Sequence, residues 1–175
     1  MEVDVNNARK EVRRLYKELS PIVTETVRKN CKDVDAIMEK IRKNLENLEN
    51  SEIQTYMLQL SVECYYLSER KEKANIMQDI AIALNKSSYA EAYNSYDGTQ
   101  GAKANQAIID TVDKEVVKML QTRVSESLKG KLDEAHRMCN TLSNVLISRN
   151  AENKLKITER GVNTSESTSN SNEDF

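Results

Sequence analysis

The sequence predicts an all-α protein built from long helices with coiled-coil-like heptad seams. Apolar residues recur at alternating steps of three and four over most of the chain, which is the spacing of one helix face. The 175 residues include only one proline and four glycines, and 31% of them are charged against 38% hydrophobic. This composition favours helices with charged outer faces and a thin core. We therefore predict a homo-oligomer, because a partner surface would complete such a core.

Residues 1–50 form the predicted N-terminal helical region. Ser20-Pro21 interrupts its first apolar run, and Pro21 suits the first turn of a new helix capped by Ser20. The first helix is therefore expected to end near Glu18 or to kink there. The next run extends from Val23 to Leu48, with residues 30–32 as a candidate break.

Residues 51–158 are predicted to form a helical hairpin core and the oligomerisation region. Ser51 and Gln54 make a candidate capping box, and Ser87-Ser88 could cap a short helix. A turn near 97–101, with two glycines, is expected to close the hairpin, and one long helix follows from Ala102. Gly130 within that helix predicts either a bend or a close approach of another helix. The predicted seam of the first arm skips Lys71 and consists of Ile53, Met57, Leu60, Cys64, Leu67, Ala74, Met77 and Leu84.

Residues 159–175 are rich in Ser, Thr and Asn and are predicted to be a disordered acidic tail. The tail ends in Asp174 and Phe175, and Phe175 is the only phenylalanine. An acidic tail with a terminal aromatic residue resembles the tip that single-strand-binding proteins present to partner proteins. The alternative is a chance ending.

Composition and motifs argue against several classes of protein. The net charge of −2 argues against a strongly basic nucleic-acid binder but leaves room for a local basic patch. Cys31, Cys64 and Cys139 are widely spaced, so we expect free thiols in a reducing cytoplasm. No apolar run is long enough for a membrane span. His136 is the only histidine, and there is no phosphate loop or nucleophile elbow. We predict a non-enzymatic protein without a metal or cofactor.

A group of cations is the strongest candidate for ligand binding. Tyrosines lie nearby in the sequence, and cations for phosphates together with aromatic rings for bases are what single-stranded nucleic acid requires. The alternative is that the cations are ordinary solvated residues and that the tyrosines pack inside the protein. The candidate DNA-binding residues are Arg70, Lys71, Lys73, Lys86 and Lys103, and the tyrosines are Tyr89, Tyr93 and Tyr96.

Three short motifs resemble the UvsY-type family of phage recombination mediators. They are a tyrosine-containing segment with a glycine turn (AYNSYDGTQG, 92–101), an acidic-basic-acidic helix start (TVDKEV, 111–116) and a final helix ending in Ser-Arg (SNVLISRN, 143–150). The resemblance covers roughly residues 64 to 150. The chain departs from the family in its N-terminal extension, its tail, and Asp97 and Gln100 in the turn, where the family is often basic.

The resemblance implies a small helical protein that forms a closed ring, wraps single-stranded DNA and helps to load a RecA-like recombinase onto strands covered by single-strand-binding protein. By position it implies DNA contacts for Arg70, Lys71 and Lys73, whereas Lys86 and Lys103 come from the residues alone. The location would be the host-cell cytoplasm if a phage encodes the chain. Two alternatives stay open: a structural or scaffolding oligomer, for example of a virion, that binds only protein, and an inhibitor that docks on a host protein through a helix face.

Overall fold

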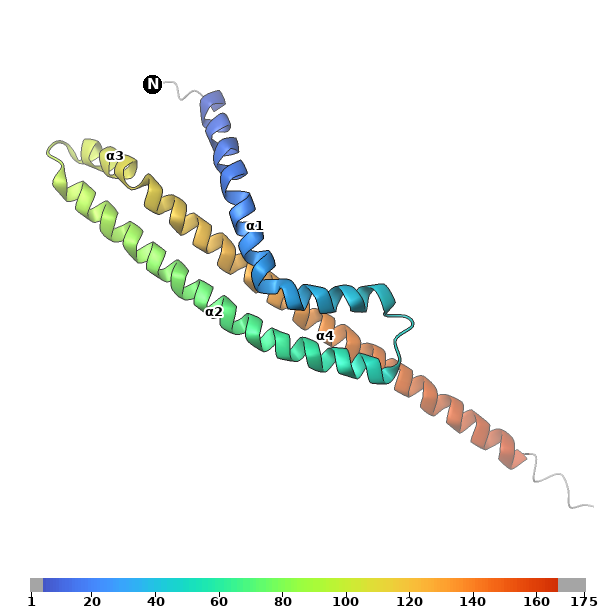
Figure 1. Cartoon of the computed structure of the whole chain (residues 1–175). Helices are drawn as coiled ribbons and strands as arrows, with labels where there is room; N and C mark the ends of the chain where they lie inside the picture. The colour runs from blue at the N-terminus through green and yellow to red at the C-terminus, as the bar shows by residue number, and fades with distance from the viewer. Residues whose placement is uncertain (1–4, 167–175) are drawn as a thin grey trace, which may run out of the picture.

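The computed structural model describes the backbone of residues 5–166 and the side chains of residues 13–157. Four helices and no strands occur in this described range: α1 (Val5–Asn44), α2 (Asn50–Ser95), α3 (Gln100–Asp110) and α4 (Val112–Glu166). Figure 1 shows an elongated arrangement in which α2 and α4 run side by side and α1 crosses them. The predicted all-α fold and the hairpin about a glycine turn are confirmed.

The core follows the contact between α2 and α4, and the second half of α1 covers one part of it (Figure 1). The predicted seam is therefore buried, or at Met57 partly buried, within one chain as far as Ala74. Beyond Ala74 the observed seam continues through the buried Ala81, whereas the predicted seam residues Met77 and Leu84 are exposed. The largest fully buried side chains are Met38, Ile41, Ile53, Leu60, Leu67, Leu128 and Leu142.

The first helix does not end near Glu18, and residues 30–32 do not interrupt it. Pro21 lies inside α1, where a proline removes one backbone hydrogen bond and bends the helix. Figure 1 shows α1 changing direction between its two halves. The other prediction for this region, a kink in the helix, therefore agrees with the change of direction of α1.

The N-cap of helix α2 lies two residues before the predicted cap, and the helix continues past the predicted end. The N-cap is Glu49, whose side chain forms a capping box with Glu52, so the box expected from Ser51 and Gln54 is wrong. Carboxylates suit this place because the helix dipole favours negative charge at its N-terminus. Ser87-Ser88 lies within α2 and starts no new helix, and the Ser87 hydroxyl donates to Glu91.

The second arm of the hairpin is two helices. Thr111 separates α3 from α4, and its hydroxyl donates to the Ala107 carbonyl at 2.7 Å. By contrast, α4 passes through Gly130 without a break. A Cβ at Gly130 would meet no atom within 4 Å, so the glycine does not serve a close helix approach. At 1.5 Å per residue α4 spans about 83 Å.

The C-terminal boundary differs from the predicted one. Helix α4 continues to Glu166, beyond the expected start of the tail at residue 159. The rest of the predicted tail, including Asp174 and Phe175, lies outside the described residues.

Candidate nucleic-acid interface

Arg70 is engaged in holding α1 against α2. Its guanidinium donates a hydrogen bond to the Asn30 carbonyl of α1, and it lies 4.0 Å from the Asp33 carboxylate. The side chain is half-buried. A guanidinium that is bound to a carbonyl inside the chain has fewer donors left for a phosphate.

Lys71 occupies the seam, at the heptad position that the sequence skipped. It lies between the buried Leu67 and Ala74, its side chain is 28% exposed, and its Nζ is 4.0 Å from Glu72. Lys73, in contrast, is exposed on the outer face of α2. The three clustered cations therefore face α1, the seam and solvent respectively.

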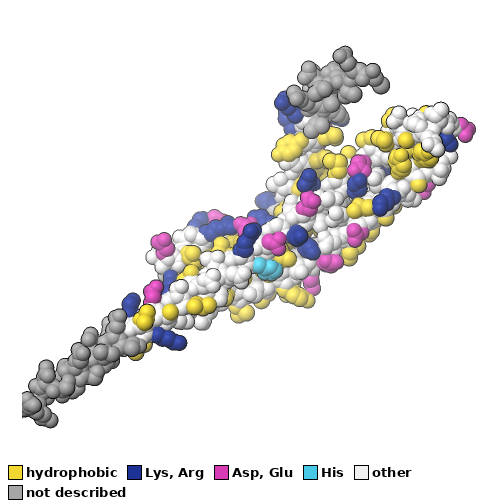
Figure 2. Space-filling view, turned by 180° about the vertical axis from the view of Figure 1, so that it is seen from behind, with side chains coloured by type: hydrophobic (Ala, Val, Ile, Leu, Met, Phe, Trp, Pro, Cys, Tyr) yellow, Lys and Arg dark blue, Asp and Glu magenta, His cyan; other side chains and the backbone are white. Residues whose placement is uncertain are grey.

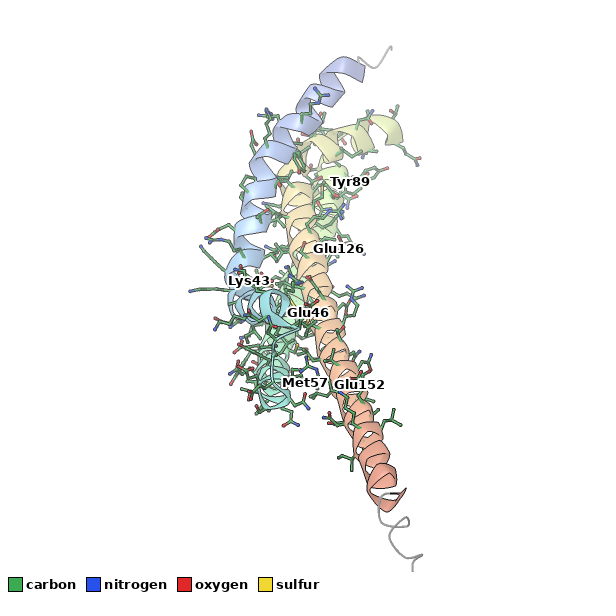
Figure 3. All side chains as sticks on the ribbon, turned by 90° about the vertical axis from the view of Figure 1, so that its right-hand side faces the viewer. Lys43, Glu46, Met57, Tyr89, Glu126 and Glu152 are labelled. Atoms are coloured by element: carbon green, nitrogen blue, oxygen red, sulfur yellow. The ribbon has the colours of Figure 1, made fainter. Side chains whose placement is uncertain are left out.

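Lys86, Tyr89 and Lys103 lie at the end of the molecule that we call the tip, formed by residues 81–119 of α2, α3 and α4. Figure 3 shows Tyr89 at this end and Met57 toward the other end of α2. Lys86 is exposed, and Lys103 on α3 is half-buried. Of the five predicted DNA-binding residues, the structure places these two at the same end of the hairpin.

Tyrosines accompany the cations at the tip. The rings of Tyr89 and Tyr93 stack, with centroids 6.3 Å apart and an interplanar angle of 25°. The Tyr96 hydroxyl donates to Asp110 at 2.9 Å, and this hydrogen bond raises the pKa of Tyr96. Gly98 in the turn has φ +143°, a conformation that favours glycine. The turn and the Tyr96 contact together hold α3 beside the end of α2.

A groove of about 560 Å³ opens at the tip. Lys86 and Tyr89 line it from α2, and Leu15 contributes from the first half of α1. Asn85 also lines the groove: its amide donates to Glu115 at 2.7 Å, while its Oδ1 is buried without a hydrogen-bond partner among the described residues. The other lining is mainly apolar, with Ile108, Val112, Val116 and Met119. The sequence did not predict Leu15 here, because it is distant along the chain.

Other cations are neutralised by a network between α1 and α4. Lys131 lies 2.9 Å from Asp35 and 3.5 Å from Glu134, and Arg42 donates to Glu134. The hydrogen bond to Asp35 raises the pKa of Lys131. Burial raises the pKa of Glu134, but Lys131 and Arg42 outweigh it, and the net pKa is lowered. This network stabilises the helix crossing and leaves little free positive charge there.

Within residues 13–157, no group of three His, Cys, Asp or Glu side chains could hold a metal ion. His136 is exposed on α4. Burial raises the pKa of the Cys31 and Cys64 thiols to about 11, and it also raises the pKa of Cys139. Raised pKa values keep these thiols protonated and weakly nucleophilic at neutral pH. None of the described helices combines the length and the apolar character needed to cross a membrane.

Comparison with known proteins gave no relatives: the chain matched no protein-family model, no curated protein and no solved structure.

Proposed function

We propose that this chain is a non-enzymatic, self-associating protein that binds single-stranded DNA at the tip. The observation that carries the proposal is the exposed Lys86 next to the stacked pair Tyr89 and Tyr93, with Lys103 at the same end. Lysines neutralise phosphates, and tyrosine rings stack on bases without regard to sequence. Because Arg70 and Lys71 make contacts inside the chain and the exposed Lys73 lies outside the tip, Lys86 and Lys103 take the leading role.

The resemblance to UvsY-type mediators extends the proposal to recombination. In that role the chain would help a RecA-like recombinase to displace single-strand-binding protein from DNA. An oligomer would present several tip sites to one strand, and individually weak sites would then give useful affinity through their combined binding.

Fluorescence anisotropy with a labelled oligothymidine at two salt concentrations tests the DNA site. The double variant Lys86→Ala/Lys103→Ala should bind more weakly, and each lost phosphate contact should flatten the slope of log K against log salt by about 0.7. Lys129→Ala, which changes an exposed lysine of α4, is the matched control and should leave the slope unchanged. Equal slopes for the double variant and wild type would refute the site.

A second function has its own support, namely a scaffolding oligomer that binds only protein. Many large apolar side chains of α2 are exposed although α2 already packs on α4. An oligomer that takes up no oligothymidine at about 50 mM salt, where phosphate contacts are strong, would favour this alternative.

A further inference from the structure

Helix α2 carries a second apolar face on the side opposite its buried seam. Ile76 lies nine residues after the buried Leu67, which at 100° per residue places it on the opposite side of the helix. Figure 2 shows apolar side chains along the edge of the body as well as at the tip. The eight exposed residues, which we call the outer stripe, are Leu58 (68% exposed), Val62 (46%), Tyr65 (65%), Tyr66 (48%), Ile76 (53%), Met77 (51%), Ile80 (49%) and Leu84 (57%).

The outer stripe follows an eleven-residue repeat. Leu58 and Ile80 are separated by two such repeats with Glu69 between them, and Val62 and Leu84 by two with Lys73 between them. A repeat of eleven residues stays on one face of a nearly straight α-helix. The stripe therefore runs straight for about 40 Å along α2, while the heptad seam faces α4.

The molecule exposes much more surface than a compact monomer of its mass. The chain exposes 13275 Å², whereas a compact monomer of 20.0 kDa exposes about 8,700 Å². Exposed apolar patches as large as those at the two ends of the stripe usually mark an interface.

The stripe is arranged symmetrically about Lys71. Each residue on one side has a partner of similar character at the same distance on the other side. The pairs are Tyr66 with Ile76, Tyr65 with Met77, Val62 with Ile80, and Leu58 with Leu84. The innermost pair, two residues on either side of Lys71, is Glu69 with Lys73, which have opposite charges.

We propose that the outer stripe binds a second copy of this chain, antiparallel, about a two-fold axis that crosses the stripe at the level of residue 71, on the side of α2 opposite the Lys71 side chain. A two-fold contact pairs residue i of one copy with residue j of the other, and j with i. In this register every apolar residue of the stripe meets an apolar residue. Glu69 of each copy meets Lys73 of the other, so two opposite-charge contacts form at the centre.

The central charges are available for this contact. Among the residues that the structure describes, neither Glu69 nor Lys73 makes an ion pair within the chain. A parallel pairing in register would instead place Glu69 against Glu69 and Lys73 against Lys73, so the charges favour the antiparallel orientation. The stripe thus deepens the self-association of the proposed function and does not depend on DNA binding.

Single charge reversals of the full-length chain test the register. Lys73→Glu makes both central positions acidic, and Glu69→Lys makes both basic, so each variant alone should repel its own copy. We expect each to dissociate at protein concentrations at least ten times higher than wild type does, as measured by sedimentation equilibrium. Circular dichroism checks that each variant keeps its helix content.

An equimolar mixture of the two variants supplies the decisive result. The acidic centre of one then meets the basic centre of the other, and a dimer as stable as wild type should form. An ion pair restored within one helix cannot explain this result, because the compensating charges lie on different molecules. Singles that stay as dimeric as wild type, a mixture that stays monomeric, or a monomeric wild-type chain would each overturn the proposal.

Lys86→Glu separates this proposal from the DNA site. Lys86 is exposed on α2 but outside the stripe, so its reversal should leave the mass unchanged while weakening uptake of labelled oligothymidine. A loss of DNA binding with an unchanged dimer supports both proposals. An unchanged dimer that ignores DNA, in wild type and variant alike, refutes the DNA site alone. A Lys86→Glu chain that dissociates like the stripe variants would overturn the register.

Discussion

The two ends of the α2–α4 hairpin are packed in different ways. Where α1 covers the hairpin, large side chains such as Met38, Leu60 and Leu128 are fully buried. At the tip the buried residues are small ones, Ala81, Ala107 and Thr111, and Ile108 and Ile109 remain exposed. Where α1 packs on the α2–α4 pair, it completes a three-helix core, because a helix pair alone covers only one stripe of each helix.

This difference separates the roles of the two ends. Burial of a Leu or Ile side chain contributes about 1.5–3 kcal/mol, so the end covered by α1 supplies most of the stability. The tip has little such burial, but it holds the groove, the stacked tyrosines and Lys86. Binding surfaces are commonly found on the less stable parts of a protein, and the tip fits that pattern.

The largest expected effect comes from removing a side chain of the three-helix core. Leu67 is fully buried, and Leu67→Ala should lower the free energy of unfolding by about 2–5 kcal/mol, because it leaves a cavity. Ile109 on α3 is 64% exposed, and Ile109→Ala should cost less than about 0.5 kcal/mol. Urea unfolding followed by circular dichroism measures both. Equal losses would show that the tip is packed as well as the other end.

The sequence predicted the seam of α2 well in its first half and less well in its second half. Ile53, Leu60 and Leu67 are buried as expected, but Met77 and Leu84 belong to the outer stripe. Helix α2 carries two apolar stripes with different periods. A prediction that follows the largest apolar residues passes from the seam to the outer stripe after Ala74. The seam continues through Ala81, whose small side chain gives a weak apolar signal.

The candidate site was only partly predictable for a related reason. Lys86 and Tyr89 could be chosen by residue type, and both line the groove at the tip. Arg70 carries the same charge, yet it binds the Asn30 carbonyl, and only the placement of α1 reveals this. The start of α4 at Val112 was also missed, because no glycine or proline marks it and the buried Thr111 makes its hydrogen bond to Ala107.

The loops at the two ends offer a second, smaller contrast. Arg149 of α4 donates to the carbonyls of Leu45, Glu46 and Leu48 in the connection between α1 and α2. Arg149→Ala should cost about 1–3 kcal/mol, because these carbonyls lose a charged donor.

At the tip, Tyr96 makes one exposed hydrogen bond to Asp110, and Tyr96→Phe should cost less than about 1 kcal/mol. The urea concentrations at the midpoints of unfolding compare the losses of the Arg149→Ala and Tyr96→Phe variants. Arg149→Lys serves as a control and should recover only part of the loss, because an ammonium cannot reach several carbonyls as the guanidinium fork does. A Tyr96→Phe loss as large as that of Arg149→Ala would contradict the contrast.

One substitution between the two ends is expected to raise stability. Gly130 is helical in α4, and an added Cβ meets no atom within 4 Å. Gly130→Ala should therefore raise the free energy of unfolding by about 1 kcal/mol, since alanine has the higher helix propensity. Gly98→Ala is the matched comparison: its φ of +143° is unfavourable for alanine, and it should destabilise the tip by about 1–3 kcal/mol. Thermal unfolding of both variants measures the difference. A loss at Gly130 would mean that another surface, such as a second copy, approaches α4 closely there, because the described chain leaves that space open.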